Sequence, residues 1–163
     1  MLLYVPEIGD HLLLTRDWQF KLYPERRNKS ISTELKLTEF KHWDPENRKY
    51  FNGWYDEEFY PRPIYNWRDR QAWEKEDQEW AQKVKQILIQ DLYIRFPYGT
   101  ILKIDRVYIR KGAKDFSSIT FHAKNIECVD GEFILSKKKK PKSYRFWAKL
   151  SDCNNIDFEL QNL

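Results

Sequence analysis

The sequence predicts a mainly β protein of the α+β class, in which a small antiparallel barrel or bent sheet carries an aromatic-rich insertion with one helix. Three observations predict this fold. Apolar and polar residues alternate in short segments toward both ends of the chain, which is the period of a strand. Turn residues separate these segments. Near the middle, apolar residues recur at the spacing of an amphipathic helix.

The first 40 residues predict a series of short strands. We expect a strand at residues 1–5, a second around the apolar run 12–14, and a third at 18–22, where Trp18, Phe20 and Leu22 alternate with polar residues. A further short strand is expected at 35–37. Residues 26–29 are polar and predict a loop.

Residues 41–98 predict the insertion. Twelve of the 27 aromatic residues lie between positions 40 and 80. Asn52-Gly53 and Pro61-Arg62-Pro63 interrupt the pattern, so residues 44–65 are expected to be largely irregular. A helix should follow, capped by Asn66 with Asp69 and limited by Pro97. Its apolar face is predicted to contain Trp73, Trp80, Val84, Ile87, Leu88 and Leu92.

Residues 99–163 return to the strand pattern. Strands are expected at 101–109, 116–123 and 133–135, with an Asp-Gly hairpin turn at 129–132. Further strands are expected around Tyr144, Phe146 and Leu150 and around Ile156 and Phe158. The chain is therefore predicted to be one domain, with residues 1–40 and 99–163 forming the barrel.

Two segments of the chain have the same pattern of turn and apolar residues, Gly9-Asp10-x-Leu12-x-Leu14 and Gly99-Thr100-x-Leu102-x-Ile104. In both, a turn glycine precedes a strand that alternates. This resembles the way strands begin in small barrels of the SH3 or Tudor type, and it implies an SH3/Tudor-like barrel. The turn chemistry is generic, so no family is assigned.

Composition excludes several classes of protein. The aromatic content offers enough apolar surface to offset the entropy of ordering, which argues against disorder. Two cysteines cannot form a disulfide framework, and no run reaches the roughly 20 apolar residues of a membrane span. The first residues lack the basic segment of a signal peptide. We therefore expect no membrane association and a cytoplasmic location, in a bacterium or an infected host cell.

The net charge of +4 is unevenly distributed. Residues 92–163 carry fourteen basic and eight acidic side chains, a net charge of +6, whereas residues 41–91 carry nine and eleven, a net charge of −2. The aromatic residues are concentrated in the acidic segment. The sequence thus predicts two unlike surfaces, one electrostatic and one aromatic.

The basic C-terminal half is the first candidate site. Five lysines within residues 137–142 attract phosphate without reading bases, and Arg106 and Arg110 share a parity with Tyr108 on the longest predicted strand. The alternatives are a solvated hairpin loop and a sheet face with cross-strand charge pairs. The candidate nucleic-acid-binding residues are Lys137, Lys138, Lys139, Lys140, Lys142, Lys114, Arg106 and Arg110.

The aromatic insertion is the second candidate site. Its rings are interleaved with arginines, a mixture that can stack bases or supply the hot spots of a protein interface. The acidic run at residues 56–58 favours a protein partner. Alternatively, the rings cover one end of the barrel and pack the helix on it. The candidate protein-binding residues are Trp54, Tyr55, Tyr60, Tyr65 and Trp67.

Catalytic and metal-binding patterns are missing from the sequence. It contains no glycine-rich phosphate loop, nucleophile elbow or HExxH motif. His42 lies near Asp44 and Glu46, but such a short stretch rarely converges on a metal. Asp105 lacks the second carboxylate of a nuclease strand. We therefore expect no enzyme activity, no cofactor and no metal.

These observations predict a non-enzymatic binding protein. The first hypothesis is contact with a nucleic-acid backbone, DNA or RNA without sequence preference, or with a nucleic-acid-binding complex, through the basic C-terminal half. The alternative is a small phage-type effector or inhibitor that binds a host protein or enzyme through the aromatic insertion. The partner's identity and the oligomeric state stay open.

Overall fold

The computed structural model describes residues 4–63, 70–110 and 117–161 of the chain. The described residues form a mainly β fold with several antiparallel sheets, as the sequence predicts. The elements in chain order are β1 (His11–Leu14), β2 (Trp18–Lys21), η1 (Arg26–Asn28), α1 (Lys29–Glu34), β3 (Leu37–Asp44), β4 (Lys49–Asp56), α2 (Arg70–Ile87), β5 (Tyr93–Phe96), β6 (Ile101–Tyr108), β7 (Ser118–Lys124), β8 (Ile126–Val129), β9 (Glu132–Leu135), β10 (Tyr144–Lys149), α3 (Leu150–Cys153) and β11 (Phe158–Gln161).

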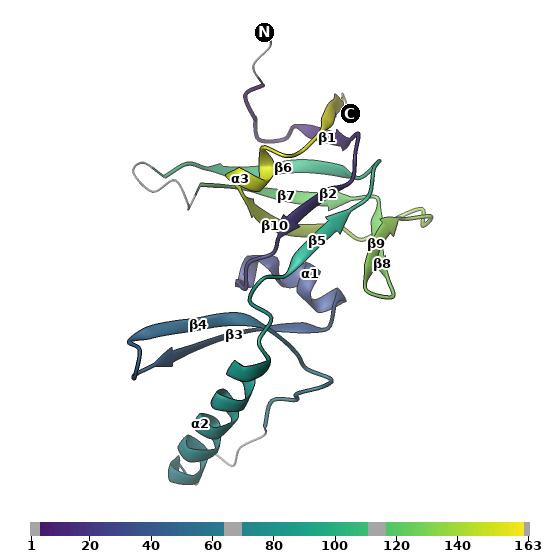
Figure 1. Ribbon diagram of the computed structural model, residues 1–163. Helices are drawn as coiled ribbons and strands as arrows, with labels where there is room; N and C mark the ends of the chain where they lie inside the picture. The colour runs from purple at the N-terminus through teal and green to yellow at the C-terminus, as the bar shows by residue number, and fades with distance from the viewer. Residues whose placement is uncertain (1–3, 64–69, 111–116, 162–163) are drawn as a thin grey trace.

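The largest sheet has five strands in the order β10-β7-β6-β1-β11, and the pairs are antiparallel (Figure 1). Alternation places one apolar face of this sheet against the β2–β5 ribbon. Trp18 of β2 contacts Phe121 and Phe146 of the sheet, with ring centroids 5.9 and 6.1 Å apart. Phe96 of β5 lies 5.3 Å from Phe146. The main hydrophobic core therefore lies between the sheet and the ribbon.

The register of β6 shifts between Ile104 and Arg106. Leu102 and Ile104 are buried in the core, and a regular strand would point Arg106 the same way. The irregularity reverses the alternation, so Arg106 and Tyr108 lie on the face opposite the core. One inserted residue thus keeps a guanidinium group out of the apolar interior.

The predicted SH3/Tudor-like barrel is not confirmed. The described strands form an open five-stranded sheet and three two-stranded sheets, with no closed barrel among them. The predicted Asp-Gly hairpin is confirmed, because Asp130 and Gly131 join β8 to β9 with positive φ angles of 51° and 81°. The sheet is thus built from hairpins but does not close.

The hairpin of β3 and β4 and the helix α2 form a unit that projects from the rest of the molecule (Figure 1). We call β3, β4 and α2 the hairpin–helix unit, and the remaining described elements the body. Phe40 and Tyr55 of the hairpin pack on Trp80, Ala81 and Val84 of α2 in a second, smaller cluster. The apolar periodicity of the sequence correctly predicted this helix.

The prediction that residues 44–65 are largely irregular holds for 45–48 and 57–63 but was wrong for 49–56, which form β4. Gly53 lies within that strand and packs closely on the segment after α2, since an added Cβ would lie only 3.1 Å from the Ile89 carbonyl oxygen and from Leu88 Cβ. This glycine therefore serves close packing and not a turn. The helix ends at Ile87, so Leu88 and Leu92 follow it, and the predicted cap at Asn66 lies outside the described residues.

Three local predictions need correction. Residues 26–29 are helical, in η1 and the start of α1, because this segment covers the edge of β10: Ser30 donates to the Arg145 carbonyl at 2.8 Å. Tyr4 and Val5 are not in a strand, while residues 1–3 lie outside the described part. Leu150 begins α3 and does not continue β10.

β5 pairs with β2 in the body, although residues 93–96 fall inside the predicted insertion. The part of the insertion that projects from the body is therefore shorter than 41–98. None of the described helices combines the length and apolar character of a membrane span.

Candidate functional site

The face of the five-stranded sheet opposite the core, here called the outer face, carries a row of basic side chains. His11 is paired with Lys103, Lys103 with His122, and His122 with Arg145. Directly opposed residues of antiparallel strands point to the same side of a sheet. Four strands therefore place two histidines, a lysine and an arginine side by side.

Burial and positive charge combine around His11. Burial and the nearby charges of Lys124 and Lys103 hold the pKa of His11 below its usual range. Asp105 partly balances the positive charge of this face, since its carboxylate lies 3.3 Å from Arg145 Nε and 3.7 Å from His122 Nε2. All three of these side chains are partly exposed.

Two further rows of the outer face follow the register shift. Arg106 and Trp147 both pair with Thr120, and Tyr108 and Lys149 both pair with Ser118. These rows lead to the end of β6, where Arg110 is exposed. Cationic and aromatic side chains thus alternate along this end of the sheet.

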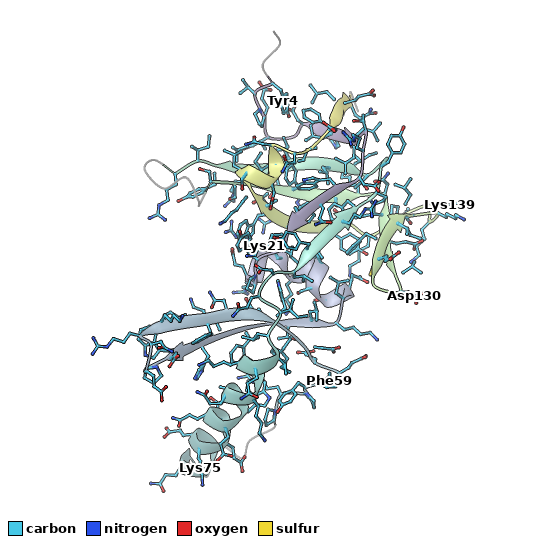
Figure 2. All side chains as sticks on the ribbon, in the orientation of Figure 1. Tyr4, Lys21, Phe59, Lys75, Asp130 and Lys139 are labelled. Carbon is cyan, nitrogen blue, oxygen red and sulfur yellow. The ribbon has the colours of Figure 1, made fainter. Side chains whose placement is uncertain are left out.

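A cleft of about 770 Å³ lies where the outer face meets the hairpin–helix unit. Its body side includes Tyr108, Arg110 and Lys149, and β4 contributes Lys49 and Tyr50. Lys21, which also lines the cleft, is labelled in Figure 2 between the body and the hairpin. The volume is within the roughly 300–1,000 Å³ of ligand sites.

A stacked aromatic pair lines the cleft on the body side. The rings of Tyr23 and Trp147 lie 5.0 Å apart and are nearly parallel, at 10°. The amines of Lys21 and Lys149 lie 4.9 and 4.8 Å from the centre of the Tyr23 ring, and the Arg27 guanidinium lies 5.6 Å from the Trp147 ring. Cation–π contacts hold these charges beside the rings.

The lysine run lies in the loop between β9 and β10, and Lys137, Lys138, Lys139, Lys140 and Lys142 are exposed. Lys142 pairs with Glu34 at 2.7 Å and Lys138 with Glu127 at 3.4 Å. The loop enters β10 at Tyr144, whereas the cleft lies at the opposite end of that strand. Figure 2 accordingly shows Lys139 far from Lys21.

The structure therefore separates the predicted basic residues. Arg110 lines the cleft, and Arg106 lies one row away from it on the outer face. The lysine loop is a separate basic surface. Lys114 lies outside the described residues.

Of the predicted aromatic site residues that the structure describes, two are buried and one is half-buried. Trp54 and Tyr55 are 1% and 2% exposed, and Trp54 Nε1 donates to the Leu22 carbonyl at 2.9 Å. Tyr60 is half-buried against the second cluster. Trp54 and Tyr55 thus form part of the packing of the hairpin, and Tyr65 and Trp67 lie outside the described residues.

Tyr23, Lys49, Tyr50, Trp147 and Lys149 were not predicted as site residues. The alternation of Arg145, Trp147 and Lys149 along β10 could have indicated that these three share the outer face. Nothing in the local sequence indicates that Tyr23 and the hairpin lie beside them. That proximity depends on long-range packing.

The two cysteines, Cys128 and Cys153, are free thiols. Burial raises the pKa of the Cys153 thiol to about 12 and also raises that of Cys128, so neither is a thiolate at neutral pH. Within the described part of the chain, no three His, Cys, Asp or Glu side chains gather in a way that would hold a metal ion.

Comparisons with family models, with curated proteins and with solved structures give no match for this chain.

Proposed function

We propose that this protein is a non-enzymatic nucleic-acid-binding protein, which contacts the sugar–phosphate backbone through the outer face of its five-stranded sheet. The observation that carries the proposal is the row of His11, Lys103, His122 and Arg145, which leads toward the cationic cleft. Ammonium and guanidinium groups contact phosphates without reading bases, so the binding has no sequence preference and weakens with salt.

The lysine loop supports a second contact with the same backbone. Its exposed amines extend the positive surface beyond the start of β10, although Lys138 and Lys142 each have a carboxylate neighbour. A long nucleic acid can reach both surfaces, whereas a short one reaches only one. Affinity is therefore expected to rise with oligonucleotide length.

The test compares two variants that remove the same charge. Lys103→Gln with Lys124→Gln removes two positive charges from the outer face, and Lys75→Gln with Lys83→Gln removes two from exposed lysines of α2. We expect only the first pair to weaken the binding of a fluorescent DNA or RNA oligonucleotide. Its salt dependence should flatten, because each lost phosphate contact lowers the slope of log K against log salt by about 0.7–0.9.

Two results would overturn the proposal. An absence of binding at about 50 mM salt would exclude backbone contact, because low salt favours it most. Equal losses in the two lysine pairs would show diffuse attraction to net charge and not a binding face. Replacing residues 137–140 by Ala then measures the separate contribution of the loop.

A protein partner is the second candidate, in the form of a phage-type effector or inhibitor that binds a host protein. Exposed aromatic residues in the hairpin and in the segment just after it favour this candidate. Trp43, Tyr50 and Phe59 are 44%, 57% and 76% exposed. Such rings are common in interface hot spots. A partner that is retained after nuclease treatment and lost in Phe59→Ala would favour this candidate over the first.

A further inference from the structure

We infer that the nucleic acid in the cleft is single-stranded, with unpaired bases stacked on Tyr50 and Tyr108. This inference rests on the proposed function and names the substrate class of the same surface. The two tyrosines come from different regions of the molecule, Tyr50 from β4 and Tyr108 from the end of β6, and both line the cleft.

Both rings are available to a ligand. Tyr50 is 57% exposed and Tyr108 is 51% exposed, although both line the cleft. Tyr50 meets Trp43 edge to face, with centroids 4.9 Å apart at 64°, so the two rings are not stacked face to face on each other. The Lys41 amine lies 4.7 Å from the Tyr50 ring centre, on a flexible side chain that a base can displace.

The cleft also carries positive charge on both sides. Its acidic groups have cationic partners of their own, because Asp91 pairs with Lys21 at 2.7 Å and Glu25 pairs with Arg27. Among the described residues, Lys49 on the hairpin and Lys149 on the body have no carboxylate partner. These two lysines are placed to take phosphates on either side of a strand that crosses the cleft.

This combination discriminates between nucleic-acid forms. In a duplex the base faces are already stacked on their neighbours and are not available to protein rings. In a single strand every base has a free face, and aromatic side chains stack on it with little regard to sequence. A basic surface alone binds both forms, whereas exposed rings between lysines favour the single strand.

The test measures fluorescence anisotropy with a 12-nucleotide DNA strand, the matching RNA strand and the DNA duplex of the same sequence. We expect tighter binding of the single strands. Tyr50→Ala and Tyr108→Ala should each weaken single-strand binding by roughly 5- to 150-fold, the range for one base stack, and should barely change duplex binding. Tyr50→Phe and Tyr108→Phe should retain affinity, because the ring remains.

Tyr93→Ala is the matched control, since Tyr93 is 55% exposed and does not line this cleft. Equal affinity for duplex and single strand would overturn this inference and leave the proposed function standing. A loss in Tyr50→Ala that is the same for both forms would also overturn it. An absence of binding to all three probes would overturn both proposals.

Discussion

The body and the hairpin–helix unit differ in how much interior each contains. Among the described residues, the main core cluster includes twenty buried side chains, and nineteen of them belong to the body. The second cluster has four, Phe40, Tyr55, Ala81 and Val84. The twentieth residue of the main core is Trp54, which belongs to β4. The body therefore contains its own core, whereas the hairpin–helix unit depends on a small cluster and on Trp54, with Leu37 of β3 partly buried against the main core.

The most severe test of this difference is Trp54→Ala. The side chain is 1% exposed and its indole N–H donates to the Leu22 carbonyl. Its loss should reduce the free energy of unfolding by about 3–5 kcal/mol, the usual range for a buried Trp or Phe. Urea denaturation measures this, with Trp43→Ala at an exposed site as the control. A change below about 1 kcal/mol would show that Trp54 is not part of the main core.

Val84→Ala should have a smaller effect that is confined to one region. Val84 is fully buried in the second cluster, and removing two methyl groups should cost about 2 kcal/mol. Hydrogen exchange should then accelerate in α2, β3 and β4 but not in β6 or β7. If exchange accelerated equally in the body, the two regions would unfold as one unit.

Acid should weaken the hairpin–helix unit through Asp44. Hydrogen bonds from the Asn47 side chain and the Glu46 backbone, with Lys85 at 3.3 Å, hold the pKa of Asp44 below its usual range. The stabilisation is therefore present above the unfolded pKa of about 3.9 and is lost as pH falls through the lower folded value. Asp44→Asn should reduce the acid dependence of hydrogen exchange in β3 and α2.

His11 should give the body a small pH dependence in a different range. Because its pKa is lowered in the folded state, its contribution to stability is complete above the unfolded value of about 6.5 and is lost as pH falls through the folded value. Thermal melting at pH 7.5 and 5 should show this loss in the wild type and a smaller loss in His11→Gln. An identical pH dependence in both would contradict the assignment.

Alternation and turn chemistry predicted most strands of the body, because Trp18, Phe20 and the Asp130-Gly131 turn carry local signals. They did not predict β4, because Gly53 is typical of a turn unless its packing against Leu88 is known. Nor did they predict the register shift at Arg106. Local patterns omit the contacts that decide such positions.

The candidate site was harder to predict than the fold. Trp54 and Tyr55 are neighbours in one strand, so they point to opposite faces of the hairpin, yet both are buried. One face meets the body and the other meets α2. The cleft joins Tyr23, Tyr50 and Trp147, which are far apart in sequence and have no shared motif. Tertiary packing within the body stacks Tyr23 on Trp147, and the packing of the hairpin on the body places Tyr50 in the same cleft.

Trp54 packs the hairpin on the body, and this packing links ligand affinity to the local stability of the hairpin–helix unit. Lys49 and Tyr50 line the cleft only while the hairpin is packed on the body through Trp54. Any ligand that bridges the cleft therefore stabilises this packed conformation. A bound strand should therefore slow hydrogen exchange in α2, which does not line the cleft. A helix remote from the ligand would in this way report its binding.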